Sequence, residues 1–123
     1  MTAFRALLLP LALVASPALA HPKVVTANPA AGATVAAPSQ ITLQLSEPLV
    51  AKLSGATLTM TGMPGMANHA PMTVAVKSSV GADGKTLVLA PSKKLPAGQY
   101  RVDWYAVSGD THRVTGTHAF SVK

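Results

Sequence analysis

The sequence predicts an all-β protein, an Ig-like Greek-key β-sandwich or barrel of about seven short strands. Short runs that alternate apolar and polar residues recur along the chain, and a period of two is typical of half-buried strands. Proline and glycine separate these runs, as expected for turns between strands. After residue 20, no stretch has a convincing apolar period of 3.6 residues, so helices are not expected.

The expected strands follow one another without a linker or an internal repeat. They comprise residues 23–27, 41–45, 56–60, 73–79, 86–90, 99–107 and 115–122. The segment Ala82-Asp83-Gly84 predicts a hairpin turn between the expected strands at 73–79 and 86–90.

In the longest expected strand, one set of alternating side chains is apolar and should face the core: Tyr100, Val102, Trp104 and Ala106. The opposite set should face outward: Arg101, Asp103 and Tyr105. Phe120 and Val122 define the inward face of the last strand. His118 shares their parity, so we expect this histidine to be packed in the protein and not to bind a metal.

Residues 1–20 differ in composition from the rest of the chain. They carry one charge, Arg5, followed by an apolar run, and they end in the small-x-small pattern Ala18-Leu19-Ala20. This order predicts a cleaved secretory signal peptide at 1–20, with the mature domain at 21–123 exported. A transmembrane anchor is the alternative, but the apolar run is shorter than the roughly 20 residues of a span. We expect no membrane insertion of the mature chain.

Charge and cysteine content limit the chemistry of the mature domain. The chain has a formal net charge of +6, which becomes +5 when Arg5 is removed. Its basic residues are scattered and form no array with aromatic residues, so nucleic acid is not an expected partner. The chain contains no cysteine, so a site for a soft metal ion would have to use ligands other than thiolate.

Cleavage after Ala20 would make His21 the first residue. Its free amine, with an ordinary pKa of about 7.7–8.0, and its ring nitrogen could then chelate one metal ion. Pro22 has no N–H and cannot supply a deprotonated amide as a third ligand. The remaining ligands would have to come from elsewhere in the fold.

Asp110 and His112 are candidates for those ligands. In an extended segment they project from the same side, because side chains alternate. Together with the amine and ring of His21 they form a set of three nitrogens and one oxygen, which suits tetragonal Cu(II). Taken singly, a turn aspartate and a surface histidine are the simpler interpretations. Glu47, at a strand end, is either an outer partner of this site or an exposed charge.

A second candidate site is a loop rich in methionine. Four methionines and one histidine recur at every third position: Met60, Met63, Met66, His69 and Met72. Glycine and proline between them argue against a helix, so the spacing is not that of a core-facing helical stripe. Thioethers are soft ligands that suit Cu(I). The alternatives are an adaptable Met-rich binding loop or chance, and Met60 could instead pack inward at its strand end.

These motifs together resemble the CopC family of periplasmic copper resistance and copper carrier proteins. The resemblance covers the whole mature chain and includes His21-Pro22, Asn28-Pro29, Ser46-Glu47-Pro48, Tyr100–Trp104, Val107–His112 and the Met/His loop. It implies a Cu(II) site and a Cu(I) site at opposite ends of a Greek-key barrel or sandwich. It further implies His21, Asp110 and His112 as Cu(II) ligands with Glu47 nearby, and His69 with several methionines as Cu(I) ligands.

We therefore expect a copper-binding protein that carries or buffers copper and is not an enzyme. The resemblance implies an inner-membrane permease of CopD type and other periplasmic copper proteins as partners, and we expect a monomer. One alternative is an oxygenase-like copper enzyme with a histidine brace. Such an enzyme needs an open coordination position on the metal and a face that binds the substrate, whereas Asp110 would occupy an equatorial coordination position here. A metal-free Ig-like adhesion module is a further alternative.

Overall fold

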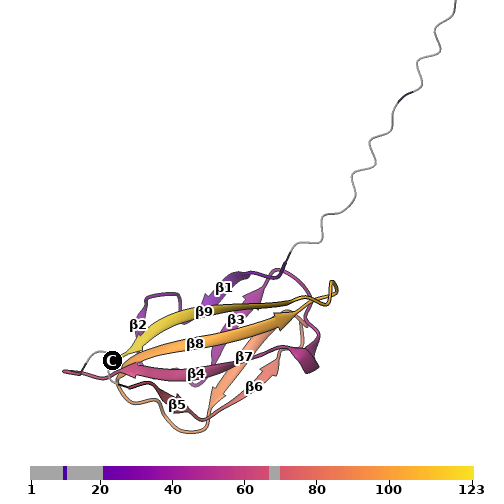
Figure 1. Cartoon of the computed structure of the whole chain (residues 1–123). Helices are drawn as coiled ribbons and strands as arrows, with labels where there is room; N and C mark the ends of the chain where they lie inside the picture. Colours follow the sequence, from indigo (N-terminus) through magenta and orange to yellow (C-terminus); the bar gives the residue numbers. More distant parts are fainter. Residues whose placement is uncertain (1–9, 11–20, 67–69) are drawn as a thin grey trace, which may run out of the picture.

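The computed structural model describes residue 10 and residues 21–66 and 70–123, and the strands between Val24 and Val122 form a two-layer β-sandwich (Figure 1). The predicted signal peptide, apart from Pro10, and His69 lie outside these residues. One layer has four strands in the order β1 (Val24–Asn28), β3 (Ile41–Leu45), β7 (Thr86–Pro91) and β6 (Val76–Val80). The other has five, in the order β2 (Thr34–Val35), β9 (Arg113–Val122), β8 (Gly98–Val107), β4 (Gly55–Gly62) and β5 (Met72–Val74).

The predicted all-β fold is confirmed. Within the described part of the chain, the only helical element is the short 3₁₀ turn η1 (Ala51–Leu53). Strands far apart in sequence are neighbours, with β3 antiparallel to β7 and β4 antiparallel to β8. The chain crosses between the layers after β1, β2, β3, β5 and β7, as in a Greek-key sandwich.

The expected number of about seven strands is too low, because the described residues form nine. The two-residue strand β2 is too short to show an alternating pattern. The run at 73–79 was expected to be one strand, but it breaks at Ala75 into β5, which pairs with β4, and β6, which pairs with β7. The carbonyl of Ala75 accepts a hydrogen bond from Ser92 N at 3.0 Å at this corner, where the chain changes sheets.

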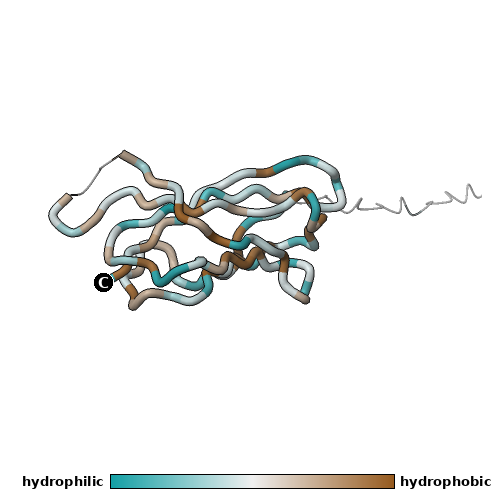
Figure 2. Tube along the Cα trace, turned by 90° about the horizontal axis from the view of Figure 1, so that it is seen from below, coloured by the Kyte–Doolittle hydropathy of each residue, from teal (hydrophilic) through white to brown (hydrophobic). Residues whose placement is uncertain are grey.

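The core lies between the two layers and is built from alternate residues of the central strands. Figure 2 shows hydrophobic and hydrophilic residues alternating along much of the chain. The four side chains of β8 predicted to face inward are all buried. His118 is also buried, and its Nε2 lies 2.8 Å from the carbonyl oxygen of Pro29. The prediction that this histidine is packed is therefore confirmed.

The hairpin turn predicted at 82–84 joins β6 and β7. The Asp83 carboxylate accepts hydrogen bonds from the amides of Lys85 and Thr86, at 2.9 and 3.0 Å, and from the Thr86 hydroxyl at 2.7 Å. Gly84 adopts a φ of 72°, which glycine reaches without a side-chain clash. The hydroxyl of Thr86, followed by the backbone donors, holds the pKa of Asp83 below its ordinary value.

Strand β8 sets the separation between the two ends of the sandwich. It begins at Gly98, beside the residues that follow β4, and ends at Val107, where the loop carrying Asp110 begins. Ten residues at about 3.3 Å each span roughly 30 Å. The two candidate copper sites therefore lie at opposite ends of the molecule (Figure 1).

Candidate metal centre

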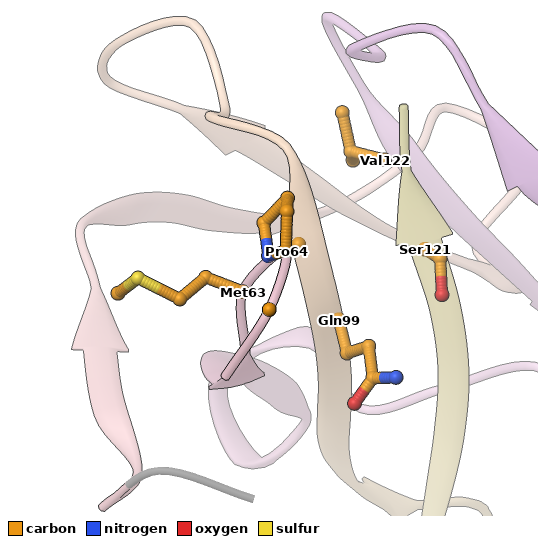
Figure 3. A pocket seen from close by; sticks show the side chains of 7 residues that line it. Met63, Pro64, Gln99, Ser121 and Val122 are labelled. Carbon is orange, nitrogen blue, oxygen red and sulfur yellow. The ribbon is translucent and has the colours of Figure 1, made fainter. Parts of the chain in front are cut away.

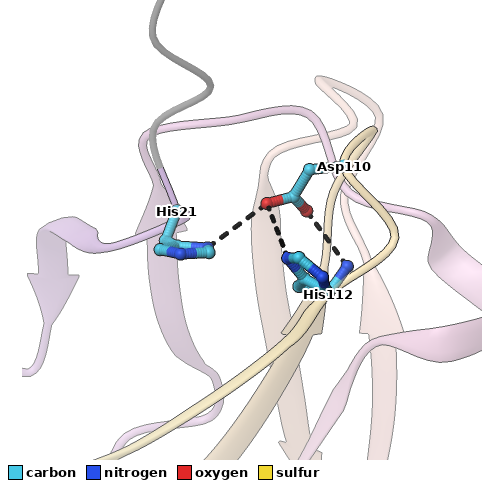
Figure 4. A group of neighbouring side chains, drawn as sticks. All are labelled: His21, Asp110 and His112. Atoms are coloured by element: carbon cyan, nitrogen blue, oxygen red, sulfur yellow. Dashed lines mark hydrogen bonds and ion pairs between the residues drawn. The ribbon is translucent and has the colours of Figure 1, made fainter.

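The structure brings together three of the predicted ligands, from two distant parts of the chain. His21 precedes β1, whereas Asp110 and His112 lie in the loop between β8 and β9. Asp110 Oδ2 is 3.2 Å from His21 Nδ1 and 3.8 Å from His112 Nδ1, and both rings face it (Figure 4). One ligand atom from each residue lies within 4.8 Å of the other two. This separation suits three ligands of a single metal ion.

The N-terminal side of the site is fixed by packing and by backbone hydrogen bonds. Pro22 is fully buried, so it anchors the chain directly after His21. Lys23 N donates to Ser46 Oγ at 3.1 Å, and Ser46 N donates to the Lys23 carbonyl at 2.8 Å. These bonds hold the first residues of the domain against the end of β3. His21 itself remains exposed and can reach a metal ion.

The loop between β8 and β9 is a tight turn that presents Asp110 and His112. Thr111 N donates to the Ser108 carbonyl at 3.0 Å, and Thr111 adopts a φ of 66°. Asp110 Oδ1 accepts hydrogen bonds from Ser108 Oγ at 3.1 Å and from His112 N at 3.2 Å. Both candidate ligands therefore come from a locally ordered turn, although the segment is not a continuous strand as the alternation argument assumed.

The surroundings of the Asp110 carboxylate favour its ionised form. Its side chain is only 8% exposed, and this burial raises its pKa. Hydrogen bonds from His112 N and Ser108 Oγ, together with the two neighbouring imidazoles, lower the pKa more strongly. The net result is a pKa below the ordinary value, so the carboxylate is ionised at neutral pH. An ionised oxygen between two imidazoles is a ready donor to a divalent cation.

Glu47 is not part of the converging group within the described residues. It is half-buried and directly follows Ser46, which contacts the N-terminal segment through Lys23. Its role at the metal stays a prediction. Ser108 is a residue that the sequence argument missed, although a serine two positions before an aspartate is a common hydrogen-bond partner for it.

The methionine loop begins with a turn that pairs Met63 with Met66 through their backbones. Met63 and Met66 exchange two backbone hydrogen bonds, of 3.1 and 2.9 Å, around Pro64-Gly65. Gly65 has a φ of 75°, as a type II turn with proline before glycine requires. Residues paired directly across such a turn have Cβ atoms about 5 Å apart on the same side. The Met63 and Met66 side chains are thus neighbours at the exposed tip.

The other members of the predicted Cu(I) set differ in their surroundings. Met72, at the start of β5, is exposed, as are Met63 and Met66. Met60 is only 4% exposed and belongs to the hydrophobic core, which agrees with the alternative that it packs inward. His69 lies outside the described residues, so its distance from the thioethers is not part of the structure. The accessible thioethers of the described chain are therefore Met63, Met66 and Met72.

A surface pocket of about 460 Å³ adjoins the methionine turn. It is lined by residues of the turn and of the facing ends of β8 and β9: Met63, Pro64, Gly65, Gly98, Gln99, Ser121 and Val122. Figure 3 shows the Met63 side chain directed away from Gln99 and Ser121. The thioether therefore faces away from the polar groups of this pocket.

No helix in the described part of the chain is long and apolar enough to cross a membrane.

The family model described as CopC domain matches residues 24–123. Copper resistance protein C of Escherichia coli is 56% identical over 110 residues, which cover 89% of this chain and 87% of that protein. Copper resistance protein C of Pseudomonas syringae pv. tomato is 53% identical over 111 residues, covering 90% of this chain and 87% of that protein.

A solved structure has the same fold. It is the crystal structure of PcoC, described as a methionine rich copper resistance protein from Escherichia coli. The two chains are 54% identical and superpose with a TM-score of 0.78, over 85% of this chain and 100% of that one. The comparisons agree with the two-layer sandwich described above.

Proposed function

Because the chain belongs to the CopC family, we propose that it is a copper-binding protein of copper resistance that carries or buffers the ion. The observation that carries this proposal is the convergence of His21, Asp110 and His112 at one end of the sandwich. Copper is the cargo, and the protein supplies ligands for it. The relatives named for copper resistance, with more than half of the aligned residues identical, support this function.

The proposed Cu(II) site combines the three converging side chains with the amine that cleavage would free at His21. In the full chain, the nitrogen of His21 is bonded to Ala20 and is an amide, which is a poor ligand. Removal of residues 1–20 would convert it to an amine beside the His21 ring. Three nitrogens and one carboxylate oxygen are the donor types that favour tetragonal Cu(II).

The proposed Cu(I) site lies at the opposite end and uses the exposed thioethers of Met63, Met66 and Met72. The tight turn at Pro64-Gly65 supports this proposal, because it places Met63 and Met66 side by side before any ion binds. His69 follows in the same loop and completes the set that we propose. Since the two ends are roughly 30 Å apart, one ion cannot be shared between the sites.

We further propose that the mature protein works as a monomer in the periplasm. Residues 1–20 would direct export, and exchange partners would be a CopD-type permease of the inner membrane and other periplasmic copper proteins. The oxidation state of copper would determine which end of the molecule binds it, because Cu(I) prefers thioethers and Cu(II) prefers nitrogen and oxygen. A carrier needs no turnover of a substrate, so we propose no catalytic activity.

The decisive experiment compares two forms of the mature protein. One begins at His21, and the matched control carries one additional residue before it. Both are titrated with Cu(II) and followed by EPR and by quenching of Trp104 fluorescence. We expect tight binding of one nitrogen-coordinated Cu(II) by the first form and much weaker binding by the second. Equal binding would remove the amine from the ligand set, and no binding by either form would refute the Cu(II) site.

A further inference from the structure

Ser108 is one of two buried polar residues in the described chain, the other being His118. It is 4% exposed and lies between the last residue of β8 and the metal-site loop. A buried hydroxyl is costly unless it forms a hydrogen bond. Ser108 Oγ forms one with Asp110 Oδ1 at 3.1 Å. The serine hydroxyl is thus directed at a proposed copper ligand.

The two oxygens of Asp110 have different surroundings. Oδ1 accepts hydrogen bonds from Ser108 Oγ and from His112 N. Oδ2 faces the Nδ1 atoms of His21 and His112, where the metal would lie. Two donors on Oδ1 prevent the carboxylate from rotating and occupy that oxygen. Only Oδ2 is then directed toward the metal position.

Thr111 completes this arrangement. Its φ of 66° is unusual for a β-branched residue and costs conformational energy. The turn brings His112 N back to Asp110 Oδ1 at 3.2 Å, so the backbone of one ligand residue fixes the carboxylate of the other. The left-handed conformation at Thr111 thus brings a second donor, His112 N, to the oxygen that already accepts a hydrogen bond from the Ser108 hydroxyl.

We propose that Ser108 is a positioning residue that makes Asp110 a one-oxygen ligand and favours Cu(II) over Zn(II) at this site. This inference rests on the proposed Cu(II) function. Tetragonal Cu(II) needs ligand atoms in set directions, so it benefits from a carboxylate that cannot rotate. Zn(II) has no geometric preference from its d electrons and loses less when that restraint is removed.

The test uses the protein that begins at His21 and three substitutions. Ser108→Ala removes the hydroxyl, Ser108→Thr retains one, and Ser79→Ala is a matched control on the exposed surface of β6. Cu(II) and Zn(II) affinities are measured by competition with chelators, and the Cu(II) EPR spectrum is recorded for each variant. Thermal unfolding and Cu(I) binding at the far end report whether the fold is intact.

We expect Ser108→Ala to lower Cu(II) affinity by about 10- to 100-fold, the usual effect of losing a partner of a metal ligand. Zn(II) affinity should fall less, the EPR parameters should shift, and Ser108→Thr should restore both. A changed unfolding temperature with an unchanged EPR spectrum and an unchanged Cu(II)/Zn(II) ratio would overturn the proposal, because Ser108 would then support only the turn. Should Ser108→Ala fail to fold, Ser108→Gly is measured against the same outcomes.

The result also separates this inference from the proposed function. If the unsubstituted protein binds no Cu(II), the site itself is wrong and the inference falls with it. If the unsubstituted protein binds Cu(II) tightly and Ser108→Ala behaves in the same way, the site stands and only the positioning role is refuted.

Discussion

Replacing Asp110 by asparagine tests the Cu(II) site with little disturbance to the fold. The two side chains have the same shape, and the asparagine oxygen can still accept the hydrogen bonds that Ser108 Oγ and His112 N give to Oδ1. The amide nitrogen then takes the place of Oδ2. This group is a hydrogen-bond donor and has no charge, so it can contact the imidazoles but cannot bind the metal.

The expected loss follows from what the structure leaves at the site. Cu(II) would keep its nitrogen ligands and lose the only carboxylate in the converging group of the described residues. Losing a mere outer partner of a ligand costs about 10- to 100-fold in affinity. Losing the ligand itself should cost at least ~100-fold, which corresponds to about 2.7 kcal/mol of binding free energy.

The assay is a chelator competition titration at neutral pH, with EPR to identify the bound species. Asp103→Asn is the matched control, because that carboxylate lies on the outer face of β8 and pairs with Arg101 at 3.1 Å. We expect the control to bind Cu(II) like the unsubstituted protein. A loss of less than tenfold in Asp110→Asn, with an unchanged EPR spectrum, would refute Asp110 as a ligand.

Three other predictions concern the far end of the sandwich, acid stability and core packing. Leucine in place of both Met63 and Met66 keeps their apolar bulk but removes the thioethers, so Cu(I) affinity in a colorimetric competition assay should fall about tenfold or more while Cu(II) binding stays unchanged. Hydrogen bonds hold the pKa of Asp83 below its ordinary 3.8, so its ionised form stabilises the fold above that pH and this contribution is lost as pH falls through the lowered value. Asp83→Asn should therefore unfold at a lower temperature at pH 7 and show a shallower loss of Tm below about pH 4, and identical acid profiles would contradict this. Gly116→Ala would place a methyl group 2.4 Å from the buried tryptophan ring and should cost about 1–3 kcal/mol in the free energy of unfolding, whereas Gly109→Ala, with no atom within 4 Å of the new Cβ, should cost much less.

The fold class was predictable because alternation along a strand is a local property. Side chains of β8 that share a parity point to one side of the sheet, so the buried set could be named from the sequence. The corner at Ala75 could not, because the alternating pattern continues through it. Whether a residue belongs to one sheet or the other depends on its partners, and the two halves of this run pair with β4 and β7, which lie in different layers.

For the candidate ligands, too, the sequence predicted some features and only the folded structure decided others. Residue types and spacing were enough to name His21, Asp110 and His112 as candidate ligands for one site and the methionines as candidates for another, because ligand chemistry belongs to the side chains themselves. The sequence could not decide whether Met60 serves the loop or the core. Its position opposite Tyr100 on β8 places it among buried side chains, and that pairing exists only in the folded sheet.

The sequence by itself therefore determined the chemistry available to this protein, namely strands, soft thioethers, and side chains with nitrogen and oxygen donor atoms. The tertiary structure alone decided which of these groups meet. His21 and Asp110 are far apart along the chain, and their 3.2 Å contact depends on the buried Pro22 and on the pairing of β1 with β3. The orientation of the Asp110 carboxylate depends in turn on a buried serine hydroxyl and a left-handed threonine, which are effects of packing and backbone geometry that local patterns do not encode.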